Sequence, residues 1–297
     1  MSIASETTRL KNAKAAIKTA IEGQDVNVPN ETLLDGMASL IERTRNSMIR
    51  RIITKISNDS VTKIGSYAFY TCYELTTADF PAVTNIGDYA FGRCDKLTTV
   101  NFPAVKGIGS NVFFYCSALT TVDFPLVISI GDSVFWNCPV LTTVNFPALT
   151  SIRPHTFKNC SALTTINFPV ARNIEAGAFD NCSALTTVIF PALTNIGSYA
   201  FQECSALTTA DFPAATSIDN GAFWKCSALT ALILRSETMA VLKYTKAFDG
   251  TPIESGTGYV YVPAALINSY KTATNWTQYA DQFRAIEDYP DICGGAE

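Results

Sequence analysis

Eight cysteines divide most of this 297-residue chain into equal lengths. Each follows the one before it by 22 residues, with no insertion: Cys72, Cys94, Cys116, Cys138, Cys160, Cys182, Cys204 and Cys226. A phenylalanine stands three residues before each of these cysteines, and a leucine stands three residues after it. Self-similarity at a fixed period of this length is typical of solenoids, in which each repeat forms one coil and stacks on its neighbours. The spacing therefore predicts a repeat solenoid.

The repeat that begins at Leu141 predicts one short strand. Its apolar Val144 and Phe146 are expected to point into the core. Side chains alternate along a strand, so Thr143 and Asn145 are expected to point outward. Each repeat thus offers the core one apolar strand face and the solvent one polar face.

A tight turn is predicted around each cysteine. Phe157, Cys160 and Leu163 lie three residues apart, which suits one helical or 3₁₀ turn with its apolar side inward. A glycine follows the repeat isoleucine in five of the eight repeats, and the other three have Arg153, Glu175 and Asp219 there. The turn at that position therefore does not require a positive φ.

The segment from Ile64 to Leu75, IGSYAFYTCYEL, resembles the core of the BspA-like leucine-rich repeats, I-G-x-x-A-F-x-x-C-x-x-L. The resemblance covers residues 53–250. It implies an α/β repeat solenoid, a right-handed stack of leucine-rich-repeat coils with a parallel sheet. About eight to nine such coils would occupy residues 46–234. The resemblance also implies adhesion and ligand binding at a cell or virion surface, without an enzymatic role.

The cysteine column has more than one interpretation. Its thiols could fill the solenoid interior as small apolar groups. Adjacent coils stack about 4.8 Å apart, a separation that a disulfide can span, so neighbouring thiols could also pair. Stacked parallel side chains share one direction, however, and a bridge would break the equivalence of two coils, which favours reduced thiols. No spacing has the form C-x₂₋₄-C, and we expect no metal site.

Charge and residue type narrow the functions open to the chain. With 47% apolar and 16% charged residues, it does not have the composition of a disordered protein. Its net charge of −4 gives no reason to expect nucleic acid as a partner. His155 is the only histidine, and the sequence contains no G-x-S-x-G, P-loop, dinucleotide-binding or H-E-x-x-H motif. We expect no catalytic residue, no cofactor and no enzymatic activity.

Aromatic residues gather at positions that vary between repeats. Invariant positions build the core, so we expect the variable position after each repeat phenylalanine to face solvent. The predicted aromatic patch contains Tyr89, Phe114, Tyr115, Trp136 and Trp224. Exposed aromatic patches often mark interaction sites. The alternative is that these rings pack between neighbouring turns of the solenoid.

The outward face of the predicted sheet is a second candidate surface. Its threonine and Asx side chains form columns, represented in the central repeats by Thr121, Asp123, Thr143, Asn145, Thr165 and Asn167. Such a ladder could bind a glycan or another polar surface. The alternative is that threonine stands there for its β-propensity and that the Asx side chains are solvated.

Residues 1–45 lack the repeat and predict a helical hairpin. Two stripes of apolar residues recur at helical spacing, and they include Leu10, Ile17, Ile21, Leu33, Met37 and Leu40. A hairpin this small cannot bury both stripes alone, so we expect it to cap the solenoid, to contact a second copy or to attach to a larger assembly. The segment Glu6 to Gly23 resembles an N-terminal module of gut-phage tail and fibre proteins, which implies attachment to other virion subunits.

Residues 235–297 predict a degenerate last repeat and a C-terminal α/β cap. Ala247 and Phe248 echo the repeat three residues late, and residues 259–262 are expected to form the final strand. Helices are expected over residues 264–272 and 276–286, and the motifs here resemble the usual C-terminal cap of BspA-like proteins. Cys293 lies outside the ladder and is expected to be exposed.

The remaining signals concern location. We find no signal peptide pattern and no apolar stretch of the roughly 20 residues that a membrane span needs, so we expect no membrane insertion. The leading hypothesis is a phage tail or fibre protein, assembled into a virion in the host cytoplasm, whose repeats contact a host surface glycan or protein. The alternative is a bacterial leucine-rich-repeat interaction protein at the cell surface or in the cytoplasm.

Overall fold

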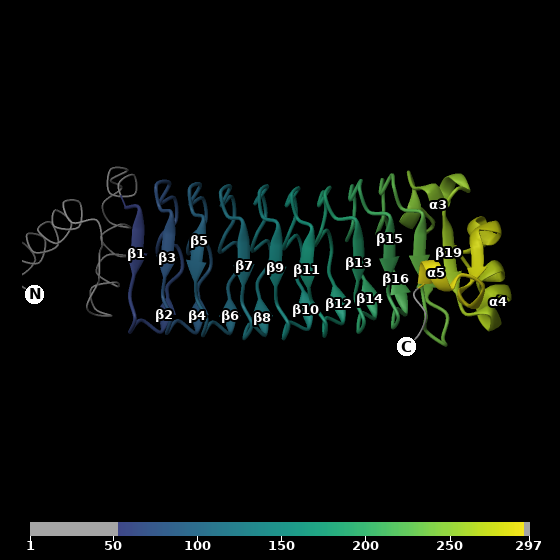
Figure 1. Cartoon of the computed structure of the whole chain (residues 1–297), viewed down its shortest axis with the longest axis horizontal. Helices are drawn as coiled ribbons and strands as arrows, with labels where there is room; N and C mark the ends of the chain where they lie inside the picture. Colours follow the sequence, from purple (N-terminus) through teal and green to yellow (C-terminus); the bar gives the residue numbers. More distant parts are fainter. Residues whose placement is uncertain (1–52, 294–297) are drawn as a thin grey trace, which may run out of the picture.

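Residues 53–293, which the computed structural model describes, form a solenoid of stacked coils that ends in a small helical unit (Figure 1). Each coil contributes one strand of three residues to a first side and one strand of two residues to a second side. Neighbouring strands on each side pair in parallel, and residues 22 apart face each other, as Thr143 and Thr165 do. The predicted parallel-sheet solenoid of 22-residue coils is therefore confirmed.

The strands of the first side lie one coil apart. They are Lys55–Ser57 (β1), Thr77–Asp79 (β3), Thr99–Asn101 (β5), Thr121–Asp123 (β7), Thr143–Asn145 (β9), Thr165–Asn167 (β11), Thr187–Ile189 (β13), Thr209–Asp211 (β15) and Ala231–Ile233 (β17), followed by Tyr259–Val262 (β19) and Phe283–Ala285 (β20).

The strands of the second side are shorter. They are Lys63–Ile64 (β2), Asn85–Ile86 (β4), Gly107–Ile108 (β6), Ser129–Ile130 (β8), Ser151–Ile152 (β10), Asn173–Ile174 (β12), Asn195–Ile196 (β14), Ser217–Ile218 (β16) and Val241–Leu242 (β18).

Sheet pairing is interrupted on both sides. Within the described coils, the first side divides into the sheets β1-β3-β5, β7-β9-β11 and β13-β15-β17-β19-β20. The second side divides between β8 and β10. In the coil of β10, Arg153 replaces the glycine that follows the repeat isoleucine in the four coils before it. A Cβ atom at Gly131, one coil earlier, would lie 2.4 Å from the Ser110 nitrogen, so that glycine serves a close approach of two coils.

The turn between the two sides carries an unbroken hydrogen-bond ladder. The amide of each repeat phenylalanine donates to a carbonyl of the next coil, as Phe135 does to Thr156 at 2.8 Å. This bond recurs in all eight coils from Phe69 to Phe223. We call this series the turn ladder. It joins coils at the points where the sheets are interrupted.

Two residues of every turn adopt the left-handed backbone conformation. The first position holds Tyr67, Tyr89, Asn111, Ser133, His155, Gly177, Tyr199 and Gly221, and the second holds Thr71, Arg93, Tyr115, Asn137, Asn159, Asn181, Glu203 and Lys225. Their φ values lie between 54° and 62°, whereas the glycines that follow the repeat isoleucine do not have positive φ. The expectation for those glycines is confirmed, and the strained positions lie two and six residues later.

The core is a column of rings beside a column of thiols. Phe135 and Phe157 stack with centroids 5.4 Å apart and planes within 1°, and the same contact recurs along the solenoid. The eight ladder cysteines are buried thiols outside any disulfide, as the favoured interpretation held. The thiol of Cys160 donates to the Phe135 carbonyl of the preceding coil at 3.2 Å, and the Cys160 amide donates to Phe157 of its own coil. The seven cysteines from Cys94 to Cys226 are therefore both small apolar fillers and donors between coils.

The C-terminal unit closes the last coil. It contains Thr245–Phe248 (η2), Pro252–Ser255 (α3), Ala264–Leu266 (η3), Ile267–Thr272 (α4), Thr277–Gln282 (η4), Ile286–Asp288 (η5) and Pro290–Cys293 (α5). Phe248 stacks on Phe223 at 5.5 Å, which confirms the late repeat. Buried Tyr270 and Trp276 then cover the end of the core. Trp276 Nε1 donates to the Ala240 carbonyl, so this large residue is hydrogen-bonded as well as buried.

Two predictions about the C-terminal unit need correction. Residues 276–286 do not form one helix, because β20 begins at Phe283 and pairs with β19, which is thus not the final strand. The tight turn predicted around each cysteine is confirmed. It is closed by 3₁₀-type bonds, such as the bond from the Cys160 amide to the Phe157 carbonyl.

Asn159→Ala should cost more stability than Asn145→Ala. Each of these half-buried amides donates one ladder hydrogen bond and accepts another. Only Asn159 has a positive φ, a conformation that costs alanine roughly 1–2 kcal/mol. Chemical denaturation should give a free energy of unfolding about 1 kcal/mol lower for Asn159→Ala than for Asn145→Ala. Equal losses would contradict the role of the backbone at this position.

The thiol ladder should make the fold sensitive to alkali. Burial raises the pKa of Cys138 to about 12, and burial also raises the pKa values of Cys116, Cys160, Cys182 and Cys204. An unfolded thiol ionises near pH 8.5, so above that pH the unfolded chain releases protons that the folded chain retains. Ionisation of these thiols should not affect the free energy of unfolding below about pH 8. It should lower the free energy of unfolding as pH rises from 9 toward 12.

Cys138→Ala isolates one thiol. Loss of its hydrogen bond to Phe113 should lower the free energy of unfolding by about 1 kcal/mol at pH 7. Above pH 9 the free energy of unfolding should fall less steeply for the variant than for the parent. The two slopes should differ by about 1.4 kcal/mol per pH unit. Val144→Ala, a buried substitution without an ionisable group, should lower stability equally at every pH. Parallel pH profiles for Cys138→Ala and the parent would contradict the burial of this thiol.

Candidate ligand-binding edge

A continuous strip of aromatic rings runs along the turns of the first five coils. We call it the aromatic edge, and its members are Tyr67, Tyr70, Tyr89, Phe114, Tyr115, Trp136 and His155. Each ring contacts another ring of the strip, either in its own coil or in the next. The rings come from the turns that connect β2 to β3, β4 to β5, β6 to β7, β8 to β9 and β10 to β11.

The ring contacts combine stacking with edge-to-face packing. Tyr67 and Tyr89 stack with centroids 4.9 Å apart and planes within 6°. Phe114 packs edge-to-face on Tyr115 at 4.4 Å and on Trp136 at 5.4 Å. Each arrangement is among the favoured geometries of aromatic pairs. The strip is therefore an ordered surface whose rings support one another.

Left-handed backbone aims the rings of the first turn position at the next coil. A Cβ atom at Gly177 would lie 2.5 Å from Nδ1 of His155, and one at Gly221 would lie 2.5 Å from the Tyr199 ring. The glycine thus leaves room for the ring that precedes it by one coil. Tyr67 instead meets Tyr89, and the two rings stack.

The predicted aromatic residues divide between the aromatic edge and a second site. Tyr115 is 39% exposed, while Tyr89, Phe114 and Trp136 are half-buried. Trp224 is also half-buried and lies four coils beyond Trp136, where the Lys225 ammonium lies 4.3 Å from the centroid of its ring. The sequence left open whether these rings are exposed or pack between neighbouring turns. The rings of the edge do both, because they contact neighbouring coils and retain exposed surface.

Two buried polar atoms at the end of the aromatic edge have no partner among the described residues. They are Nε1 of Trp136 and Nδ1 of His155, whose ring centroids lie 6.4 Å apart. Each belongs to a half-buried side chain. An unsatisfied buried polar atom costs free energy, so its retention needs a local reason.

Amide side chains on the sheet face form hydrogen bonds with one another and with neighbouring carboxylates. Thr121, Asp123, Thr165 and Asn167 are exposed, and Thr143 and Asn145 are half-buried. The Asn145 amide donates to Asp123 at 2.7 Å, and the Asn167 amide donates to Asn145 at 2.6 Å. This amide ladder stops at β13, where Ile189 occupies the column and is 61% exposed.

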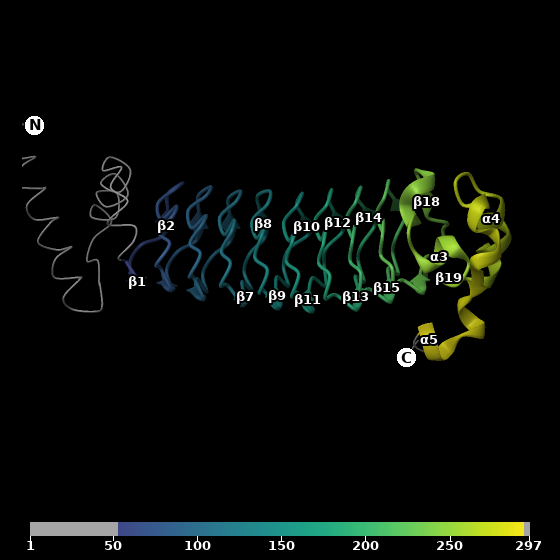
Figure 2. The same ribbon diagram turned by 90° about the horizontal axis from the view of Figure 1, so that it is seen from above.

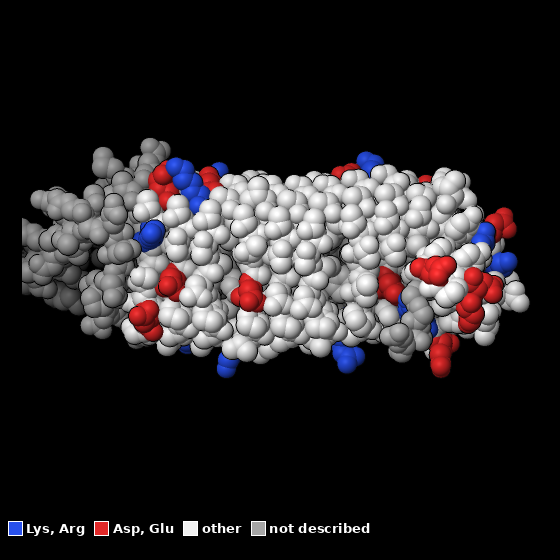
Figure 3. Space-filling model, in the orientation of Figure 1, with Lys and Arg blue, Asp and Glu red and all other residues white. Residues whose placement is uncertain are grey.

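The C-terminal segment covers the same face at the far end of the solenoid. Ile233 and Tyr261 are buried there beneath Ile286 and Tyr289, and α5 turns back along the strands (Figure 2). The uncovered part of the sheet face carries few charged side chains over β7 to β13 (Figure 3). It is a weakly charged surface.

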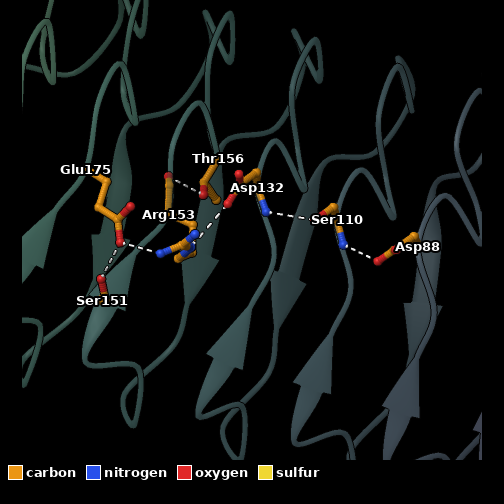
Figure 4. Close-up of polar contacts among 7 residues, drawn as sticks. All are labelled: Asp88, Ser110, Asp132, Ser151, Arg153, Thr156 and Glu175. Carbon is orange, nitrogen blue, oxygen red and sulfur yellow. Dashed lines mark hydrogen bonds and ion pairs between the residues drawn. The ribbon is translucent and has the colours of Figure 1, made fainter.

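A polar chain follows the second side of the solenoid (Figure 4). Asp88 accepts from the Ser110 amide at 2.8 Å, and the Asp132 amide donates to the Ser110 hydroxyl. Arg153 then joins Asp132 at 3.1 Å to Glu175 at 2.8 Å. These carboxylates are engaged along the chain, and Arg153 lies between two of them.

A shallow groove of about 510 Å³ continues this side over β12 to β18. It lies where Gly197 leaves a gap between Glu175 and Asp219, and Lys243 and Ser217 also line it. Burial alone would raise the pKa of Asp219, but hydrogen bonds from Asn220, Lys243 and Ser198 outweigh burial and lower it. These donors therefore stabilise the ionised form of the Asp219 carboxylate, and its oxygens already accept their hydrogen bonds.

The structure does not place all predicted residues. The attachment residues Leu10, Ile17, Ile21, Leu33, Met37 and Leu40 lie outside the described residues, as does the side chain of Cys293. Within the described part, no helix is long and apolar enough to cross a membrane.

Sequence reasoning missed three members of the aromatic edge, Tyr67, Tyr70 and His155. Glycines at 177 and 221, and asparagines at 137, 159 and 181, share columns with bulky residues. Both residue types favour positive φ. These columns were therefore the sequence signal that two residues of each turn adopt the left-handed backbone conformation.

Comparison with known protein families identifies the repeat. A family model for the BspA type leucine rich repeat region matches residues 50–164 and 150–258. A search among curated proteins found no match.

Several solved structures resemble parts of the solenoid. A leucine rich repeat protein of T. pallidum is 26% identical with a TM-score of 0.47, over 52% of this chain and 78% of that one. A leucine-rich repeat protein of Bacteroides ovatus is 22% identical with a TM-score of 0.49, over 64% and 65%. A leucine rich cell surface protein of Faecalibacterium prausnitzii is 22% identical with a TM-score of 0.37, over 77% and 82%.

The assignment rests on the family model and not on these partial superpositions. The model covers residues 50–258, more than half of the 297 residues. The matched span contains the turn ladder, the thiol column and the whole aromatic edge. The chain belongs to the BspA-type leucine-rich repeat family.

Proposed function

We propose that this chain is a binding protein without catalytic activity and that its ligand contacts the aromatic edge. The supporting observation is that Tyr67, Tyr89 and Tyr115 occupy left-handed positions on the surface. Glycine or asparagine stands in the same columns of other coils, so the fold itself does not need a ring there. Strained residues that the fold does not require cluster at functional sites.

The ionisable groups of the described surface favour binding over catalysis. Glu175 and Asp219 are held by cationic and hydroxyl neighbours, and Arg153 spans two carboxylates. Catalysis of proton transfer needs a group that is free to exchange a proton with substrate. The pairing of these groups supports a recognition surface.

We further propose that residues 1–45 attach the chain to a phage virion that is assembled in the host cytoplasm. The two apolar stripes of that segment and its resemblance to gut-phage tail and fibre modules support this proposal. In this role the solenoid would meet a host surface glycan or protein. The second candidate is a bacterial interaction protein, at the cell surface or in the cytoplasm, in which the segment caps the solenoid or joins two copies.

Substitution of two edge rings should abolish surface binding without unfolding the protein. The edge variant Tyr89→Asn/Tyr115→Asn introduces at each position a residue that occupies the same column elsewhere, as Asn111 and Asn137 do. The labelled variant should be retained on a panel of bacterial cells several-fold less than the parent, and its circular dichroism spectrum should still be that of the folded solenoid.

The control is Tyr199→Asn/Trp224→Gln, which changes one first turn position and one ring that follows a repeat phenylalanine, both outside the aromatic edge. Gln202 occupies the column of Trp224 one coil earlier. The control should be retained like the parent. Equal retention of the edge variant and the parent would refute the proposed binding surface.

Removal of residues 1–45 should separate attachment from folding. Particles purified from cells that make the full chain should contain it, and particles from cells that make residues 46–297 should not. Circular dichroism of the shortened chain should still show the solenoid. Normal incorporation of the shortened chain would exclude attachment through this segment.

A further inference from the structure

We propose that the aromatic edge takes a neutral polysaccharide strand that lies along the solenoid axis. This inference rests on the proposed function and names the ligand of the same surface. It depends on the shape of the ring array, on the charges beside it and on the polar groups at its end.

The rings form a line and not a pocket. Contacts between coils, from Tyr67 to Tyr89, Phe114, Trp136 and His155, have centroid separations of 4.9 to 6.4 Å and carry the strip across five coils. The described groove lies elsewhere, over β12 to β18. Protein partners concentrate binding energy in a central, desolvated pocket. A ribbon of half-exposed rings instead suits a linear ligand that repeats along its length.

Pyranose rings provide such a repeat. One face of a pyranose presents C–H groups, which pack on the face of an aromatic ring, while its hydroxyls point sideways to polar partners. Tyr67 and Tyr115, 47% and 39% exposed, lie in the first and third coils of the strip. Once one sugar of a strand is bound, the next sugar has a high effective concentration at the next ring. Affinity should therefore grow with ligand length.

The charges next to the edge argue for a neutral strand. Arg93 lies over the Tyr115 ring at 5.8 Å, and Lys96 pairs with Glu74 at 2.7 Å. The carboxylates of the neighbouring column, Asp88 and Asp132, accept from Ser110 and Arg153 (Figure 4). Among the described residues, these charged side chains give the rings neither an excess of cations for an acidic glycan nor a set of free carboxylates for a basic peptide.

Polar groups continue the strip on its C-terminal side. The second turn position passes from Tyr115 to Asn137, Asn159 and Asn181, whose half-buried amides form a ladder with bonds of 2.6 and 3.1 Å. Nε1 of Trp136 and Nδ1 of His155 lie in neighbouring coils and have no hydrogen-bond partner in the described part of the chain. Rotation of these half-buried rings toward a bound strand would give each atom a hydroxyl to contact.

Direct titration with defined oligosaccharides tests the proposal. The probes are cellohexaose, chitohexaose, mannohexaose and xylohexaose, their disaccharides, and the acidic hyaluronan hexasaccharide, each added to the full chain in a calorimeter. At least one neutral hexasaccharide should bind, and its disaccharide should bind about tenfold more weakly or not at all. Binding should be unchanged by salt, since no ion pair is involved.

The edge variant Tyr89→Asn/Tyr115→Asn should weaken hexasaccharide binding by about tenfold or more, because two stacking rings are lost. The control Tyr199→Asn/Trp224→Gln should bind like the parent. Failure of all neutral hexasaccharides to bind at millimolar concentration, salt-sensitive binding of hyaluronan alone, or equal binding by the edge variant would each overturn the glycan inference.

Cell retention separates this inference from the proposed function. Retention that requires the edge rings but disappears after the cells are treated with protease would identify a protein ligand, which overturns the polysaccharide and leaves the binding surface in place. Retention that survives protease and is inhibited by the hexasaccharide supports both. Retention that is independent of the edge rings overturns both.

Discussion

The backbone of the repeat phenylalanine holds each coil to its neighbours. Its amide donates to the next coil, and its carbonyl accepts both the cysteine amide of its own coil and the cysteine thiol of the next one. The cysteine is small enough to fit and polar enough to donate there, which no purely apolar residue of that size would do. Ring stacking, thiol burial and the direction of every turn depend on this bond set.

The same bond set frees the turn surface to vary. Once the ladder fixes the backbone into two left-handed residues per coil, the side chains at those positions are no longer required by the core. Tyrosine, asparagine, histidine and glycine therefore alternate in one column while the phenylalanine and cysteine columns stay constant. The repeat separates folding from recognition by assigning them to different positions.

Much of the fold could be predicted from the 22-residue period, because each column has one environment in all coils. Val144 and Phe146 are buried as predicted, and β19 lies where alternating residues indicated a strand. Strand β20 was mistaken for helix because its three residues are too few to show a period, and its pairing with β19 decides its conformation. Four of the seven edge residues were identified, but the contact of Tyr67 with Tyr89 depends on a positive φ, which hydrophobic pattern does not reveal.

The uneven pairing of the coils has a mechanical consequence. The turn ladder is continuous, whereas the strands of the first side do not pair between β5 and β7 or between β11 and β13, where core rings stack across the first side. A solenoid bent at its ends would therefore give first at these two seams and hinge about the turns. The aromatic edge lies on the hinge line, so its rings would keep their spacing while the opposite side yields. A rod built this way can flex under load and still present an unchanged surface to whatever it holds.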